Sequence, residues 1–240
     1  MSLLRTKLVK KEKAAEGTML FQFEKPEGFT YTAGQFADYT LLEPSETDAE
    51  ANTRGFTLAS APYEPNLMCT TRMRDTAFKR VLKNMPLGTD VELDAPYGSF
   101  TLHSKLDRPA VFLTGGIENH ACAQHHLAIG PRQDWAHDYV VLLQQASRGC
   151  SIPGRAEPCG RCRSQRHRRA HYDGAGKSRH GWTGETGYVD AAMLARHIQD
   201  LSAPIYYLCG PARMVTAMRS LLNGAGVDDD DIRTEEFTGY

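Results

Sequence analysis

Four residues between positions 54 and 60 have side chains suited to a ligand that carries phosphate and a flat ring. Arg54 is a planar, forked cation of the kind that binds phosphate through two parallel hydrogen bonds. Phe56 offers a flat aromatic face, and Thr57 and Ser60 offer hydroxyl groups. The same stretch, RGFTLAS, is also compatible with an ordinary strand that carries an exposed arginine.

A second anion-binding group is predicted at Thr76. The stretch TAFKRVLKNMP places Phe78, Val81 and Leu82 on one face of a short helix that a proline ends. The backbone amides of Ala77 and Phe78 then lie at the helix N-terminus, beside the Thr76 hydroxyl. Such a terminus is a ready site for a pyrophosphate.

Two apolar runs in the second half of the chain predict strands buried on both faces. PIYYLCGP ends in Cys209, Gly210 and Pro211, and its glycine lets a ligand approach the backbone closely. VFLTGG ends in Thr114, Gly115 and Gly116, a glycine turn of the kind that cradles phosphate. Open α/β sheets bind ligands beyond the carboxyl ends of such strands. A buried cysteine at a strand end is common, however, and is the alternative interpretation of Cys209.

The elements that must position these residues divide into two kinds. Residues 1–104 contain short strand-like runs separated by proline and glycine, which predicts a closed antiparallel barrel with one helix. Residues 105–240 alternate strands with amphipathic helices, one with Asp190 as its N-cap and one ending near Gly224. This alternation predicts a parallel α/β sheet.

Taken together, these motifs resemble those of the ferredoxin–NADP reductase superfamily. Residues 54–60 resemble its Arg-x-(Tyr/Phe)-(Ser/Thr)-x-x-Ser stretch, and residues 209–214 its Cys-Gly-Pro-x-x-Met element. YTAGQF, with Ala33 in place of proline, resembles the family's Pro-Gly-Gln strand entry, and GTDVELDAPYGSFTL resembles the strand that closes its barrel. The resemblance covers residues 3–117 and 177–240, about three quarters of the chain.

The resemblance implies a six-stranded antiparallel Greek-key barrel that binds FAD, followed by a parallel-sheet nicotinamide-binding domain. It further implies a flavoprotein reductase that passes a hydride from NADH or NADPH to FAD. The electrons would go on to a ferredoxin, a flavodoxin or an oxygenase component. A plant-type Cys-x4-Cys-x2-Cys cluster motif is absent, so an iron–sulfur partner would be a separate chain.

The resemblance also assigns roles to residues. Thr57, Cys209 and Glu235 are the catalytic candidates, with Thr57 at flavin N5, Cys209 at the flavin–nicotinamide contact and Glu235 near the reacting pair. Phe237 would cover the flavin face, with Tyr240 as a competing candidate and a frayed tail as the alternative. The remaining cofactor-binding candidates are Arg54, Phe56, Thr57, Ser60, Thr76, Ala77 and Phe78 for FAD, and Thr114, Gly115, Gly116, Gly210, Pro211 and Met214 for the nicotinamide nucleotide.

Composition and charge argue against some classes of binding partner and cellular location. The 28 basic and 29 acidic residues nearly balance, so no overall charge favours nucleic acid or an anionic membrane. The N-terminus has no apolar run of signal-peptide or membrane-span length. We therefore expect a cytoplasmic protein, whose even number of cysteines does not imply disulfides. We also expect it to be a monomer.

Residues 118–176 show neither the strand pattern of residues 1–104 nor the strand–helix alternation of the rest of the chain. They contain four of the six cysteines, six of the nine histidines and eight arginines, with no apolar period. Back-translation with a one-nucleotide shift lets residues 118–126 encode Arg-Ile-Thr-Pro-Val-Arg-Ser-Ile, which resembles the family's next motif. We therefore interpret this segment as frame-shifted, with loose packing or disorder expected except for a strand at DYVVLL, and with family-like sequence returning at residue 177.

Two other functions remain open. The first is a flavin-binding protein with impaired nicotinamide binding and no turnover. The second is a zinc or nucleic-acid module in this segment, since Cys159 and Cys162 lie near His167 and His171 among several arginines. The frame interpretation explains these residues without a metal site.

Overall fold

The computed structural model describes residues 3–15, 17–105, 107–115, 139–144, 168–172 and 189–237. Their contacts divide the chain into two compact units, which meet in sequence between Thr101 and Leu102. Each unit has its own hydrophobic core.

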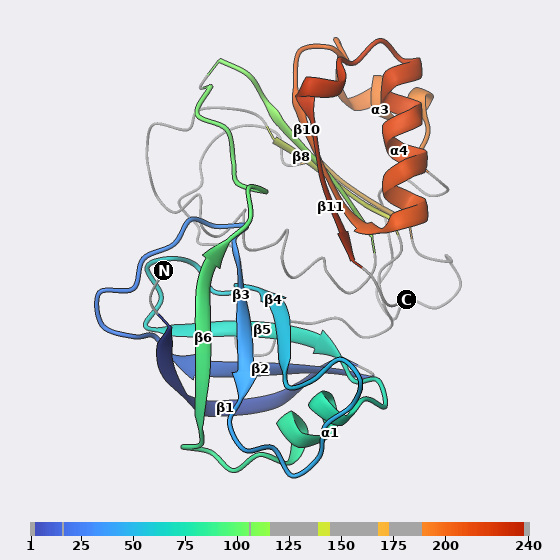
Figure 1. Cartoon of the computed structure of the whole chain (residues 1–240). Helices are drawn as coiled ribbons and strands as arrows, with labels where there is room; N and C mark the ends of the chain where they lie inside the picture. The colour runs from blue at the N-terminus through green and yellow to red at the C-terminus, as the bar shows by residue number, and fades with distance from the viewer. Residues whose placement is uncertain are drawn as a thin grey trace. The chain divides into compact units, whose positions relative to one another are not determined.

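The first unit is a six-stranded sheet with one helix (Figure 1). Its sheet order is β4-β3-β6-β1-β2-β5, and every pair of neighbours is antiparallel. This confirms the predicted antiparallel six-stranded architecture. The elements are β1 (Leu4–Ala15), β2 (Thr18–Glu24), β3 (Phe36–Leu41), β4 (Thr53–Thr57), β5 (Asn66–Arg72), α1 (Ala77–Asn84) and β6 (Asp90–Tyr97).

Alternation of buried and accessible side chains explains these strands. Along β3, Ala37, Tyr39 and Leu41 are buried while the residues between them are partly accessible. Because side chains of a strand point alternately to its two faces, one face of β3 forms the core. Phe23 of β2 packs its ring 4.9 Å from that of Tyr39.

Helix α1 begins and ends where the sequence predicts. Thr76 is its N-cap, and its side chain accepts a hydrogen bond from the Lys79 N–H. Near its other end, the Lys11 ammonium donates to the carbonyl oxygens of Lys83 and Met85, at 2.6 and 2.8 Å. A cation at a helix C-terminus is favourable because the carbonyl dipoles point toward it.

The second unit is a five-stranded sheet in the order β11-β10-β7-β8-β9, with all neighbours parallel. This confirms the predicted parallel α/β domain. Helix α4 packs on β10 and β11 (Figure 1). The elements are β7 (Ala110–Gly115), β8 (Tyr139–Gln144), β9 (Arg168–Tyr172), α3 (Ala191–His197), β10 (Ile205–Pro211), α4 (Ala212–Gly224), a 3-10 turn (Asp229–Asp231) and β11 (Ile232–Phe237).

Two strands lie inside residues 118–176. The expected strand at DYVVLL is β8, which pairs with β7. Strand β9 was not predicted, because RRAHY contains no apolar alternation. It pairs with β8 in parallel register from Arg168 to Tyr172, so backbone pairing extends into this part of the segment.

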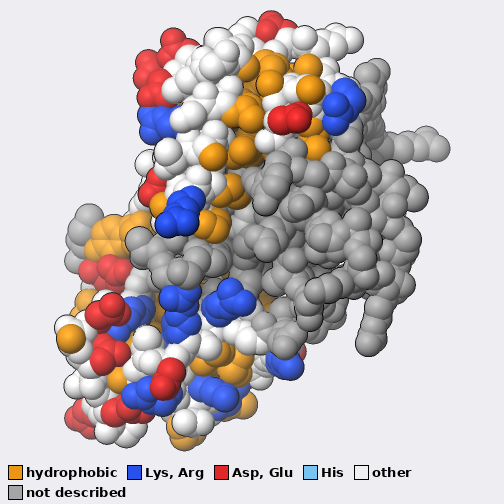
Figure 2. Space-filling view, turned by 90° about the vertical axis from the view of Figure 1, so that its right-hand side faces the viewer, with side chains coloured by type: hydrophobic (Ala, Val, Ile, Leu, Met, Phe, Trp, Pro, Cys, Tyr) orange, Lys and Arg blue, Asp and Glu red, His pale blue; other side chains and the backbone are white. Residues whose placement is uncertain are grey.

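Among the described residues, no helix has the length and apolar character needed to cross a membrane. On the face drawn in Figure 2, acidic and basic side chains intermingle over the barrel unit. No group of three or more potential metal ligands occurs in the described part of the chain, and the cysteines of the segment 118–176 lie outside it.

Candidate functional site

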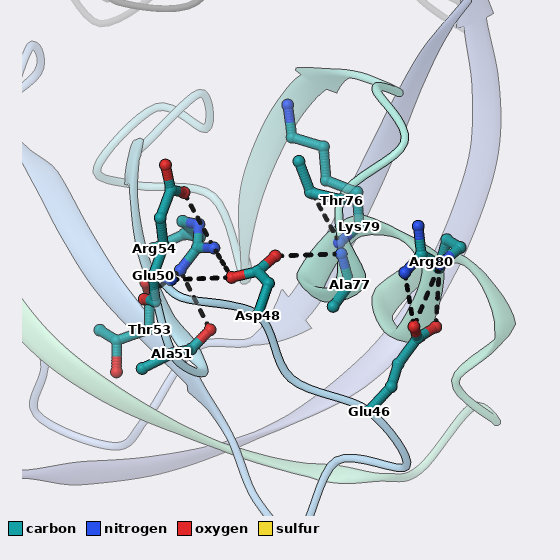
Figure 3. Close-up of polar contacts among 10 residues, drawn as sticks. All are labelled: Glu46, Asp48, Glu50, Ala51, Thr53, Arg54, Thr76, Ala77, Lys79 and Arg80. Atoms are coloured by element: carbon teal, nitrogen blue, oxygen red, sulfur yellow. Dashed lines mark hydrogen bonds and ion pairs between the residues drawn. The ribbon is translucent and has the colours of Figure 1, made fainter.

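A fixed arginine lies beside the start of α1 (Figure 3). Arg54 Nη1 donates to the backbone carbonyl oxygens of Glu50 and Thr53, both at 2.7 Å. Its guanidinium carbon lies 5.3 Å from the centre of the Phe78 ring. These contacts hold the fork in one orientation, with Nη2 directed at the carboxylate of Asp48, 2.9 Å away.

The same carboxylate receives a second donor from the helix. The Ala77 N–H donates to Asp48 Oδ2 at 3.1 Å, while Asp48 Oδ1 accepts from Arg54 (Figure 3). The structure thus brings together two groups that the sequence predicts as phosphate ligands, close enough to share one anion. This set of donors fits a phosphate group.

The groups around the Asp48 carboxylate favour a negative charge at that position. Partial burial raises the pKa of Asp48, but hydrogen bonds from the Glu50 N–H, from Arg54 and from the Ala77 N–H together bring it below its usual value. An ionised oxygen is therefore stabilised between Arg54 and the helix N-terminus.

Phe56 lies between Phe78, which packs beside Arg54, and Tyr39 of the barrel core. Its ring centre lies 5.9 Å from that of Phe78 and 5.9 Å from that of Tyr39. Phe56 is only partly buried, so part of its ring remains accessible. Phe78, in contrast, is 2% exposed and packs in the core of the first unit.

Thr57 lies on the opposite face of β4 from Phe56. Thr57 is opposite Phe36 in the pairing of β4 with β3, whereas Phe56 is opposite Ala37. On the Thr57 face, the ring of Phe36 lies 5.7 Å from that of Tyr97. This aromatic pair was missed from the sequence, where YTAGQF and DAPYGSF were interpreted only as strand motifs. An aromatic residue at each of two paired strands beside Thr57 was the available signal.

Ser60 does not present its hydroxyl to a ligand in this structure. It is fully buried, its oxygen lies 2.7 Å from the Tyr31 hydroxyl, and it accepts from the Met68 N–H at 3.1 Å. The Ser60 hydroxyl thus has a structural role within the first unit, and its contact to FAD stays a prediction. These bonds join the loop after β4 to β5 and to the residues before β3.

In the second unit, Cys209 and Glu235 are neighbours. The register of β10 with β11 places them directly across from one another. Cys209 is fully buried, and Glu235 Oε2 is buried with no hydrogen-bond partner among the described residues. Burial raises the pKa of Glu235 to about 7. Glu235 can therefore hold or release a proton near neutral pH, next to Cys209.

The glycines of this unit allow backbones to meet. A Cβ on Gly210 would lie 3.0 Å from the carbonyl oxygen of Gly115 and 3.0 Å from Met214 Cε. Thr114 is buried and pairs with Cys209. The carboxyl ends of β7 and β10 are thus in direct contact.

Pro211 completes the turn into the next helix. It ends β10 and precedes Ala212, the first residue of α4, without a side-chain cap. Phe237 continues β11 opposite Pro211, but its side chain lies outside the described residues, as do Gly116 and Tyr240.

Asp48 was the main residue that the sequence did not reveal. It stands in the acidic run ETDAE, whose composition is typical of a solvated loop. Only the fold places it over the helix N-terminus.

Comparisons with known proteins agree with this geometry. Residues 159–220 match the oxidoreductase NAD-binding domain family. The match begins inside the segment interpreted as frame-shifted, which places the return to family-like sequence earlier than residue 177. A component of the Na(+)-translocating NADH-quinone reductase of Yersinia pestis is 36% identical over 61 residues, 24% of this chain. The match covers only 15% of that relative's length.

Solved structures share the whole fold. The FAD/NAD-binding domain of a nitric oxide dioxygenase from Vibrio cholerae has a TM-score of 0.71 at 17% identity, covering 97% of this chain and 98% of that one. A ferredoxin NADP+ reductase from Neisseria gonorrhoeae, with bound FAD and NADP, has a TM-score of 0.71 at 14% identity, covering 98% and 99%. These findings confirm the resemblance to the ferredoxin–NADP reductase superfamily that the sequence predicts.

Proposed function

We propose that this chain is a flavoprotein reductase unit that passes a hydride from NADH or NADPH to FAD and electrons on to an acceptor protein. The observation that carries the proposal is the pair of anion donors in the barrel, Arg54 and the Ala77 N–H, which converge on a single carboxylate. Two donors at a fixed separation suit a dinucleotide pyrophosphate. The bound FAD of the Neisseria gonorrhoeae relative supports the choice of flavin.

The barrel residues would hold the flavin in this proposal. Arg54 and the amides of Ala77 and Phe78 would bind the pyrophosphate. Phe56, with part of its ring accessible, would lie beside the ring system, and the Thr57 hydroxyl would approach the reacting nitrogen. When bound, FAD supplies the redox chemistry, and the protein supplies orientation and electrostatics.

The second unit would position the nicotinamide. Gly210 adds no side chain of its own where the ends of β7 and β10 meet. Cys209 would lie at the nicotinamide contact, and Glu235 would hold a proton beside it. The NAD-binding family match over residues 159–220 supports this assignment.

An absorbance spectrum of the purified protein with excess FAD tests flavin binding. We expect a flavin band that stays with the protein through gel filtration, and FAD rather than FMN on release. A colourless protein would refute the proposal. NADH and NADPH oxidation with ferricyanide then tests turnover, and bound flavin without turnover would support the alternative of a flavin-binding protein with impaired nicotinamide binding.

For the electron acceptor we propose a class of protein. Ferredoxin, flavodoxin and oxygenase components are the candidates. The Na(+)-translocating quinone reductase component among its relatives is consistent with an electron-transfer role. Reduction of each purified acceptor by the flavin-loaded chain, followed by its own absorbance change, would choose among them.

A further inference from the structure

An internal carboxylate occupies the groups that we assign to the flavin pyrophosphate. Asp48 Oδ1 accepts from Arg54 Nη2 at 2.9 Å and from the Glu50 N–H at 3.0 Å. Its other oxygen accepts from the Ala77 N–H at 3.1 Å (Figure 3). A ligand phosphate and this carboxylate need the same donors, so they cannot both use them.

The other contacts of the two Nη atoms of Arg54 do not relieve this conflict. Nη1 is directed at backbone carbonyl oxygens, and Nη2 also lies 3.0 Å from the carboxylate of Glu50. The Arg54 side chain is only 17% exposed, while that of Glu50 is 74% exposed. Asp48 is therefore the inner anion, and Glu50 adds a weaker, solvent-facing one.

The segment that carries Asp48 is tied down at a second point. Glu46 Oε1 accepts from Arg80 Nε of α1 at 3.0 Å. Thus residues 44–50, which we call the acidic flap, are held on the first turns of α1 by charged contacts from Glu46 and Asp48. The flap contains no apolar core residue: within it, only Pro44 and Ala49 are apolar, and neither is fully buried.

Both ends of the flap have strained backbones. Glu43 has φ of 45° and Ala51 has φ of 60°, and both are non-glycine residues in the left-handed region. Such residues persist only where surrounding contacts hold them. They also mark the two points about which the flap would rotate when its carboxylates are displaced.

We propose that the acidic flap is an intramolecular competitor of the flavin pyrophosphate, and that FAD binds by displacing Asp48 from Arg54 and from the α1 N-terminus. This inference rests on the proposed flavin function of these groups. Such a device would lower flavin affinity while keeping Arg54 and the helix end ordered before the ligand arrives. It would also make flavin retention depend on flap opening.

The rival role for Asp48 is to position Arg54 and stay in place when the ligand binds. The two roles predict opposite results for Asp48→Asn, which keeps the size of the side chain but removes its charge and one of its two acceptor oxygens. Under competition, FAD binds about tenfold more tightly, because a charged carboxylate no longer competes. Under positioning, FAD binds more weakly.

FAD affinity of the full chain, measured by flavin fluorescence at fixed pH and salt, decides between them. Asp90→Asn is the matched control, since it removes one exposed barrel carboxylate that pairs with Lys7 and does not contact Arg54. Its affinity should equal that of the wild type. Glu50→Gln should tighten binding by about twofold to threefold, less than Asp48→Asn, because it removes only the exposed anion. An affinity of Asp48→Asn equal to or below the wild type, with native circular dichroism, would overturn the proposal.

Hydrogen exchange gives a second readout. Saturating FAD should speed exchange of amides in residues 44–50 and slow it at Ala77 and Phe78. Slower exchange in both segments would overturn the flap proposal even if FAD binds. If Asp48→Asn fails to fold, the exchange result on the wild type and the Glu50→Gln affinity decide.

Failure of the flavin function is distinguishable. If neither wild type nor Asp48→Asn binds FAD, inorganic pyrophosphate is titrated into both by calorimetry. Tighter pyrophosphate binding by Asp48→Asn then supports the competing flap while the flavin proposal fails. Equal or absent binding of pyrophosphate overturns both.

Discussion

Arg54 acts through the shape of its guanidinium as much as through its charge. One nitrogen is anchored on carbonyl oxygens while the other faces the anion position, a division that the single ammonium of lysine cannot reproduce. We predict that Arg54→Lys lowers FAD affinity by about tenfold, and Arg54→Ala by roughly a hundredfold. Fluorescence titration measures both. Arg5→Ala, at an exposed position of β1, should leave the affinity unchanged. Wild-type affinity in Arg54→Ala would remove Arg54 from the site.

Gly210 is required by a backbone contact. In Gly210→Ala the new methyl group would lie 3.0 Å from the Gly115 oxygen and 3.2 Å from its nitrogen, so a strand must shift. We expect a loss of about 1–3 kcal/mol in the free energy of unfolding, with weaker NAD(P)H binding. Urea unfolding and nucleotide titration measure these. Gly224→Ala, where nothing lies within 4 Å, is the control and should stabilise α4 by roughly 0.5–1 kcal/mol.

Glu235 should make stability depend on pH. Its pKa is raised by burial to about 7 from 4.5, so between these values the folded state binds more protons than the unfolded state. The free energy of unfolding then falls as pH rises through that window. Glu235→Gln removes this contribution, so its stability relative to the wild type should grow from pH 5 to pH 8. Denaturant unfolding at each pH measures the difference, and parallel curves for the two proteins would contradict the assignment.

At the scale of elements, the residue that caps a helix contributes measurably to the free energy of unfolding. Asp190 caps α3, its carboxylate accepting from the Met193 N–H at 2.7 Å. We predict that Asp190→Ala lowers the free energy of unfolding by about 1 kcal/mol. Asp190→Asn retains an acceptor and should lose only a few tenths. Equal losses in the two variants would show that the cap is not the cause.

Strands and helices could be predicted where buried residues recur at a regular spacing along the sequence. Strands β7 and β10 and helices α1, α3 and α4 were expected from apolar runs, caps and terminal glycines, and the structure has them. The strand β9 was missed because its residues, RRAHY, carry no alternation, and its position depends on backbone pairing with β8. Ser60 was assigned to the ligand because its type is right, but the fold turns it toward Tyr31 and Met68.

Charged residues far apart in sequence were the least predictable part of the site. The motif identifies Arg54 and Ala77 as anion donors, since each lies in a recognisable local pattern. Nothing local indicates that Asp48 reaches both. Its contact with Ala77 spans 29 positions and depends on the path of the loop between β3 and β4.

At the scale of the whole molecule, the frame interpretation remains a prediction for residues 118–158, because the family match already begins at residue 159. This segment follows β7 in sequence and contains β8 of the second sheet, so a chain rebuilt in the shifted frame, with family-like sequence restored, should bind NAD(P)H more tightly. Its FAD affinity should be unchanged, because the proposed flavin groups lie in the barrel. Nucleotide and flavin titrations of both chains test this. Sequencing the source DNA across these codons is the direct check, and identical nucleotide affinities would contradict the interpretation.

The sheet order of the barrel also has a consequence during synthesis. Strand β1 lies between β2 and β6, and its pairing with β6 joins Leu4 to Leu93. On the ribosome, one edge of the first strand therefore stays unpaired until the sixth strand has emerged. Such an edge is a template for association with other nascent chains. Translational pausing before β6 (Asp90–Tyr97) has left the ribosomal exit tunnel should thus favour aggregation, whereas pausing after it has emerged should not.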